Sequence, residues 1–265
     1  MATAKKTTTK TSTPKTSTEV ATVKKTSSAV VSIQEQLKAQ AAAAANKIGA
    51  PSGSSIRYSK GKFVLPDGTE AESIDVVIVD FVSKNMYYEN AYDKDNIVPP
   101  NCFSISPEPK GMVPSANSPD KQCEDCGSCP MNQFGSAGAG KACKNTRLLA
   151  VLPPDADADT PMWTLSVPPT AIKNFDGYVS SVLRTFQMPP VAVVTTVSLD
   201  PNEDYFKPVF GDPRPNDNLE AHFGRREEAE TVLAAEPDIS SFGQTKPATS
   251  RGKAAPARKT AAARR

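Results

Sequence analysis

The residues most able to do chemistry in this chain are its five cysteines, which all lie in one short region. Cys102 is followed by Cys123, Cys126, Cys129 and Cys143, and the 265-residue chain has no others. Thiolates are preferred ligands of Zn²⁺, and a Cys-x-x-Cys turn places two of them on one ion. The N-terminal region has no apolar secretory segment, so we expect a reducing compartment, where clustered cysteines indicate a metal or redox site.

The cysteine spacing predicts a structural zinc site with four thiolate ligands. We expect Cys102, Cys126, Cys129 and Cys143 to bind the ion, with Cys123 as an alternative to Cys102. The stretch "QCEDCGSCPMNQFGSAGAGKACK" is rich in Gly, Ser and Pro, so a bound metal would have to order it. An iron–sulfur cluster and a Cys-x-x-Cys redox pair are the alternatives, although such a redox pair normally opens a helix in a thioredoxin-like setting.

Residue types that would indicate catalysis are scarce. The single histidine, His222, falls in a predicted helix, whereas catalytic zinc sites usually use histidine ligands and a catalytic cysteine needs a basic partner. The segment "GSAGAGK" lacks the spacing of a phosphate-binding loop, and "DADAD" lacks the calcium-loop pattern. We therefore expect a protein that is not an enzyme.

The elements that would position these cysteines are mostly short strands. Apolar and β-branched runs predict strands, and the spacing of apolar residues predicts two helices. The expected strands are 62–65, 73–81, 86–92, 102–106, 146–152, 162–167, 191–200 and 205–210. The expected helices are 168–187 and 218–236, the second broken near Gly224. This order predicts a mainly β (α+β) fold, an OB-like small barrel with a zinc-ribbon-like insert at about 100–146.

Charge divides the chain into three parts. Residues 1–47 hold eight Lys and two Glu, and residues 243–265 hold three Lys, four Arg and no acid. These ends carry +6 and +7, so the remainder of a chain of net charge +2 carries −11. Both ends lack the apolar residues that folding requires. We expect them to be disordered basic arms that bind polyanions. A short helix is expected at 32–47, before a folded core at 48–242.

No run of about 18 apolar residues occurs, so no transmembrane helix is expected. Together with the absence of a secretory segment, this predicts a cytoplasmic protein, in the host cytoplasm if the chain is viral.

Three motifs resemble a known class of proteins. "PPNCFS", "CGSCPMNQFGS" and "GKACKNTRLLAVL" are similar to the zinc-containing core of bacteriophage single-stranded DNA-binding-type proteins. The resemblance spans roughly 75–210 and implies an OB-like domain interrupted by a zinc insert, as in the zinc-bearing OB domain of replication protein A. The doubled Cys-x-x-Cys at Cys123 and the basic C-terminus "ARKTAAARR" depart from the pattern. Such proteins often end in an acidic tail that recruits partners.

Single-strand binding needs aromatic faces for stacking and cations for phosphates, and the core has both near the cysteines. About half of the aromatic residues should instead belong to the core, and Tyr87 and Tyr88 must face opposite sides of a strand. The candidate nucleic-acid-binding residues are Tyr87, Tyr88, Tyr92, Phe103, Lys110, Lys121, Phe134, Lys141, Lys144, Arg147 and Trp163.

The sequence therefore predicts a non-catalytic, phage-encoded protein that binds single-stranded DNA in replication or recombination, with an OB-like core and a structural Zn²⁺. The alternative is a zinc-stabilised adaptor whose acidic core binds a replication or transcription partner while the arms hold nucleic acid. A third hypothesis is a nucleoid-type protein whose arms bind duplex DNA.

Overall fold

The computed structural model describes residues 54–91, 93 and 97–243. The predicted arm at 1–47 with its helix at 32–47, Tyr92, and all of the predicted tail except Gly243 lie outside the described residues. The described part is mainly β, with two sheets and few helices, as the sequence predicts.

A small antiparallel sheet begins the described chain. It consists of β1 (Arg57–Ser59), β2 (Lys62–Val64) and β3 (Glu70–Ala71) in that order. A Pro-Asp-Gly turn joins β2 to β3. Gly68 has a φ of +88° there, a conformation that favours glycine. Phe63 is fully buried and attaches this sheet to the main core.

The larger sheet is organised around one long strand, β4 (Ser73–Tyr87), and its hydrogen-bonded order is β7-β6-β4-β8-β9. β6 runs along most of β4 on one side. On the other side, β8 pairs with the first part of β4 and β5 with the last part. The remaining strands are β5 (Cys102–Ser106), β6 (Lys144–Leu152), β7 (Trp163–Val167), β8 (Val193–Leu199) and β9 (Pro208–Pro215).

This sheet is open, so the expected closed OB-like barrel is not observed. β7 and β9 stand at its two ends and do not pair with each other. Prolines 208, 213 and 215 lie in β9, and proline lacks the N–H that an additional strand would need. At the other edge, Ser55 bridges to Thr164 of β7, so a short segment occupies the position that closure would require.

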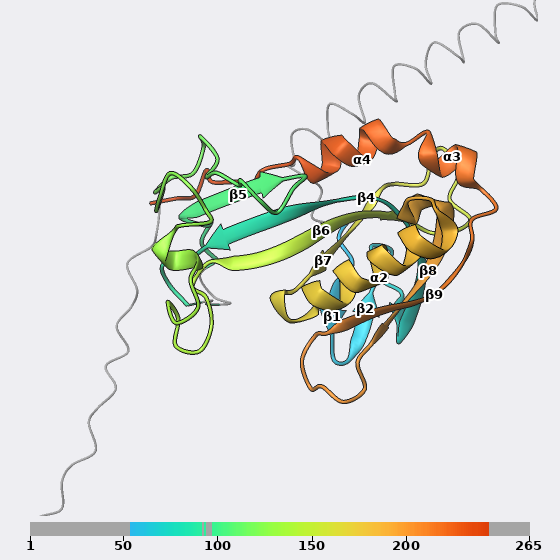
Figure 1. Ribbon diagram of the computed structural model, residues 1–265, viewed down its shortest axis with the longest axis horizontal. Coiled ribbons are helices and arrows are strands. Elements are labelled where there is room, and N and C mark those ends of the chain that lie inside the picture. The colour runs from blue at the N-terminus through green and yellow to red at the C-terminus, as the bar shows by residue number, and fades with distance from the viewer. Residues whose placement is uncertain (1–53, 92, 94–96, 244–265) are drawn as a thin grey trace, which may run out of the picture. The chain divides into compact units, whose positions relative to one another are not determined.

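One face of the sheet is covered by α2 (Ile172–Phe186), as Figure 1 shows. The short 3-10 turn η2 (Pro169–Ala171) leads into it, and Ala171 is the N-cap residue. Phe175, Val179 and Val182 pack against the strands in the main core. Gln187 ends the helix in a left-handed conformation with φ of 53°, a common way for helices to terminate.

The opposite face is covered by α4 (Arg226–Leu233), which follows the short α3 (Leu219–Phe223) after a break at Gly224, as predicted. Ala229 and Leu233 of α4 pack on Val79 and Val82 of β4. Because successive strand residues point to opposite faces, β4 serves both layers: Val76 and Ile78 contact the α2 side. Among the helices that the structure describes, none has the length and apolar character needed to cross a bilayer.

Candidate functional site

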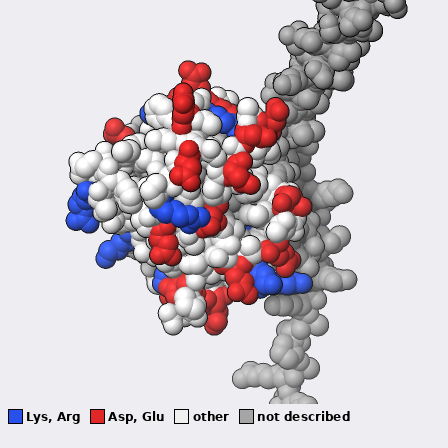
Figure 2. Space-filling model, turned by 90° about the vertical axis from the view of Figure 1, so that its right-hand side faces the viewer, with Lys and Arg blue, Asp and Glu red and all other residues white. Residues whose placement is uncertain are grey.

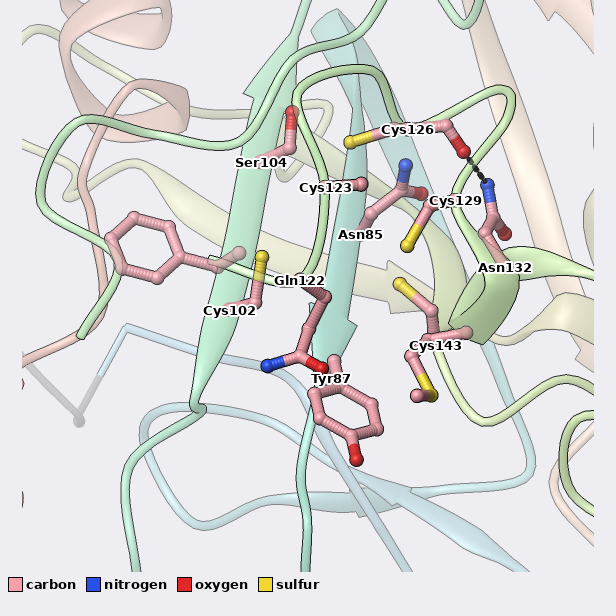
Figure 3. A pocket seen from close by; sticks show the side chains of 12 residues that line it. Asn85, Tyr87, Cys102, Ser104, Gln122, Cys123, Cys126, Cys129, Asn132 and Cys143 are labelled. Carbon is pink, nitrogen blue, oxygen red and sulfur yellow. Dashed lines mark hydrogen bonds between the residues drawn. The ribbon is translucent and has the colours of Figure 1, made fainter. Parts of the chain in front are cut away.

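All five cysteines line one small pocket, although they come from separate parts of the chain. Cys102 begins β5 and Cys143 directly precedes β6, while the loop between these strands supplies Cys123, Cys126 and Cys129. Figure 3 shows the sulfur atoms of Cys126, Cys129 and Cys143 turned toward a shared space beside Cys102. All five are free thiols. The folded chain therefore brings together every residue that the sequence predicts as a metal ligand.

Four of these cysteines are held in place by backbone interactions. Cys102 is registered against Tyr87 in the β4–β5 ladder. The N–H of Cys126 donates to the carbonyl of Met112 at 3.0 Å, and that of Cys143 donates to Met131 at 2.8 Å. The Cys129 carbonyl accepts the N–H of Asn132 at 3.0 Å, at the start of the 3-10 turn η1 (Pro130–Asn132).

The glycine-rich return between Cys129 and Cys143 forms a tight turn rather than a phosphate-binding loop. The N–H of Gly135 donates to the carbonyl of Gly140 at 3.0 Å, and Ala137 bridges to Gly140. Gly135 and Gly138 have φ values of +94° and +64°, which β-carbon-bearing residues rarely adopt. These glycines let the chain reverse and bring Cys143 back to the pocket.

Burial sets the acid–base properties of the thiols. Burial, together with the neighbouring Cys126, Cys129 and Cys102, raises the pKa of Cys143 to about 12. Burial also raises the pKa of Cys126, opposed by hydrogen bonds from Ser104 and Asn85. These thiols are therefore neutral at neutral pH unless a cation displaces their protons, and binding of a metal would release protons.

A polar shell that the sequence analysis missed surrounds the thiols. Asn85 donates to the sulfur of Met112 at 3.3 Å and accepts from the Asn145 amide at 2.7 Å. The Asn132 amide donates to the carbonyl of Cys126 at 2.6 Å. Such partners orient metal ligands. Asn132 and Asn145 adjoin the cysteine motifs, but Asn85 lies far away in sequence and gives no local signal.

The described residues contain no group of three or more His, Cys, Asp or Glu side chains already arranged to hold a metal ion. The donor set is nevertheless chemically suited to zinc, which binds four thiolates at about 2.3 Å from each sulfur. The thiols that line the pocket would have to draw together around an ion.

Beside this pocket, Phe134 presents an aromatic ring to solvent. Its side chain is 80% exposed, the largest value among the exposed large apolar residues of the described chain. The Lys141 ammonium lies 5.1 Å from the ring centroid. It also donates to the side-chain oxygens of Asn132 at 3.3 Å and Asn145 at 3.1 Å. An exposed ring and a positioned cation therefore lie on the same turn.

The other predicted aromatic contacts divide into exposed and buried residues. Tyr87 is half-buried and lines the cysteine pocket, whereas Tyr88 is 38% exposed, in keeping with their expected opposite orientations. Phe103 is only 1% exposed, so its ring has no face for a base. Trp163 is half-buried and packs against the main core.

The predicted cations also differ in their surroundings. Arg147 forms a two-point ion pair with Asp176 of α2, at 3.3 and 3.0 Å, so its charge is already compensated. Lys110 and Lys121 are exposed in the loop. Lys144 is exposed and donates to the carbonyl of Lys141 at 3.0 Å. The sequence could not reveal the Asp176 pairing, because the two residues are brought together only by packing of α2 on the sheet.

His222 is fully buried in α3, and its Nδ1 lies 3.1 Å from the Asn216 side-chain oxygen. Burial lowers its pKa. It is not among the residues that line the cysteine pocket. This placement fits the structural role expected from sequence.

Charge is segregated over the folded core. Residues 200–243 contain eleven Asp and Glu against four Lys and Arg, whereas residues 101–147 contain four acids and five bases. Figure 2 shows the side of the molecule formed by α3, β8 and β9, where acidic side chains predominate. Along the sequence, the acidic residues are therefore concentrated in 200–243 rather than in the cysteine loop, although Glu236 accepts hydrogen bonds from Ser115 and Asn117 of that loop.

Comparison of the chain with protein families, with curated proteins and with solved structures finds no match.

Proposed function

We propose that this protein is a non-catalytic single-stranded DNA-binding protein whose cysteine loop is ordered by one structural Zn²⁺. The observation that supports the proposal best is the pairing of two features on one loop. Five thiols line one pocket. Beside it, the Phe134 ring is 80% exposed and the Lys141 ammonium lies near that ring. Stacking on aromatic rings together with phosphate contacts is how proteins bind single strands with little sequence preference.

In this proposal the metal orders the loop, and the ordered loop positions the ring of Phe134. Zinc would be bound by Cys102, Cys126, Cys129 and Cys143. When bound, zinc would neutralise the negative charge of the thiolates and fix them in a tetrahedral arrangement. Phe134 would stack on a base, with Lys144 close to the phosphates. The resemblance of the motifs to phage proteins supports the same function in replication or recombination.

A closed OB-like barrel is not required for this role. The open sheet supports the loop at the end formed by β4, β5 and β6, where Tyr88 is also exposed. The distribution of charge favours the same region, because nucleic acid would be repelled by the acidic residues between 200 and 243. The basic segments 1–47 and 243–265 would add sequence-independent attraction to phosphates.

The acidic half of the core favours a second candidate function. A surface of this charge suits a basic partner protein, such as a replication or transcription protein, while the basic segments hold nucleic acid. In that case the folded core would have little affinity for DNA.

Strand preference distinguishes the two candidates. We expect the full chain and the fragment 48–242 both to bind labelled oligo-dT much more tightly than a matched duplex, measured by fluorescence anisotropy at several salt concentrations. The fragment should show a smaller salt dependence, since it lacks the basic segments. If removing the basic segments abolished all binding of single strands, the adaptor would be favoured instead. If the full chain bound duplex and removing these segments abolished that binding, the nucleoid-type alternative would be favoured.

Replacing Phe134 with alanine tests the stacking surface directly. We expect affinity for oligo-dT to fall by about 1–3 kcal/mol, roughly 5- to 150-fold in Kd, which is the range for one base–aromatic stack. Stability should hardly change, because the ring is 80% exposed. The matched control is Tyr205→Ala, which removes a 48% exposed ring in the acidic half. Equal losses in the two variants would exclude Phe134 as a specific contact.

A further inference from the structure

We propose that Cys123 is a reserve ligand of the metal centre, one that replaces Cys143 but none of Cys102, Cys126 and Cys129. The inference rests on the proposed zinc site and extends it, since four thiolates suffice for a tetrahedral ion and the pocket contains five. It also differs from the expectation from sequence, in which Cys123 competes with Cys102.

Burial separates the five thiols into two groups. Cys102, Cys126 and Cys129 are 8%, 7% and 5% exposed, whereas Cys123 and Cys143 are both half-buried. The three buried residues form an inner trio, and the two others line the same pocket. Either half-buried cysteine could therefore supply the fourth ligand to the same trio.

Backbone anchoring decides which of the two is the ordinary ligand. Cys143 is held by its N–H bond to Met131 at 2.8 Å and by the start of β6. Within the described part of the chain, no backbone hydrogen bond holds Cys123. Cys143 is thus already positioned beside the trio, while Cys123 could approach it without breaking a backbone hydrogen bond.

The spacing of Cys123 is also compatible with metal binding. Cys123-x-x-Cys126-x-x-Cys129 repeats the two-residue separation that allows neighbouring thiolates to share an ion. The segment could therefore place three ligands around one metal, with Cys102 of β5 as the fourth. No rearrangement of β5 would be required.

An exchange of Cys143 for Cys123 would have a mechanical consequence. Cys143 closes the turn that contains Phe134 and Lys141, whereas Cys123 precedes that turn. With Cys143 as ligand, the turn is fastened to the metal at both ends. With Cys123 as ligand, the ion stays bound but the C-terminal end of the turn is released, so the position of Phe134 is no longer held by the metal.

The test compares four forms of the full-length chain: the unchanged protein, Cys123→Ser, Cys143→Ser and the double variant. Zinc content is measured by elemental analysis, and Co²⁺ substitution reports the number of thiolate ligands by absorption. We expect near one equivalent of metal in the unchanged protein and in both single variants, with a four-thiolate Co²⁺ spectrum in each. The double variant should lose its metal, and Cys143→Ser should bind oligo-dT more weakly although its metal is retained.

Zinc in the unchanged protein and in Cys123→Ser but none in Cys143→Ser would overturn the reserve role and leave the zinc site intact. Absence of zinc from the unchanged protein would instead remove the metal centre itself. Should Cys143→Ser fail to fold, zinc transfer to a chromogenic chelator decides the question in the other variants. We expect faster transfer from Cys123→Ser than from the unchanged protein, since a reserve thiol recaptures a partly released ion, and equal rates would overturn the proposal.

Discussion

Replacing Cys126 with serine is expected to abolish zinc binding and to unfold the loop between β5 and β6. Cys126 belongs to the buried trio that both proposed ligand sets require, and a hydroxyl is a much poorer ligand for zinc than a thiolate. The glycine-rich part of the loop cannot compensate by packing. Between residues 107 and 143 the only regular element of the loop is the three-residue turn η1, and its glycine-rich part is exposed.

The expected size of this effect is large. Structural zinc contributes about 10–16 kcal/mol of apparent binding energy in zinc-finger peptides at neutral pH, and that energy is folding energy for the segment that holds the metal. Amide hydrogen exchange should therefore become fast throughout 107–143, while β4, β8 and α2 remain protected. The unchanged protein treated with a chelator should behave in the same way.

Cys123→Ser is the matched control, since it removes a thiol from the same pocket but leaves four other cysteines to bind the metal. Its loop should retain zinc, and the amide hydrogens of the loop should still exchange slowly. If the loop of Cys126→Ser exchanged as slowly as that of the unchanged protein, packing and hydrogen bonds would suffice to order it, and the structural role proposed for the metal would be lost.

Replacing Phe175 with alanine is expected to destabilise the folded core by about 3–5 kcal/mol, the usual cost of removing a buried phenylalanine side chain. Phe175 is fully buried where α2 meets the sheet. Its ring packs edge-on against Phe81 of β4, at 5.1 Å between centroids, and against Phe210 of β9, at 5.0 Å. The change would remove contacts with two strands and leave a cavity between the layers.

The loss is a large fraction of the 5–15 kcal/mol that usually stabilises a domain. It should appear in urea denaturation as a lower midpoint with an unchanged slope. Leu183→Ala is the control on the same helix, because Leu183 is 47% exposed and should alter the free energy of unfolding much less. Similar losses in both variants would mean that α2 does not pack on the sheet through Phe175.

Elements with a strong local pattern could be predicted from the sequence. The apolar spacing in 168–187 predicts a helix, and α2 occupies 172–186 with Phe175, Val179 and Val182 buried. Leu183 of the same helix is apolar but exposed, whereas Tyr178 is buried and hydrogen-bonded to Thr195 at 2.7 Å. Periodicity identifies the apolar side of a helix, but the shape of the opposing sheet decides which residues at the margins of that side are buried.

The architecture was predicted less well than the elements. The expected strand at 86–92 is instead the end of β4, which extends to Tyr87. A succession of short strands is compatible with a barrel or an open sheet, because strand patterns do not specify which edges pair. Here β9 contains three prolines and β7 is bordered by Ser55, and the sheet stays open.

By itself, the sequence determined that this protein has a mainly β core between two basic segments, and that its cysteines are confined to residues 102–143. Only the tertiary structure decided how the individual side chains are used. It buried Phe103, paired Arg147 with Asp176, left Phe134 exposed beside Lys141, and grouped Cys102 with Cys126 and Cys129. These outcomes depend on contacts between residues that are distant along the chain, and composition and spacing contain information only about near neighbours.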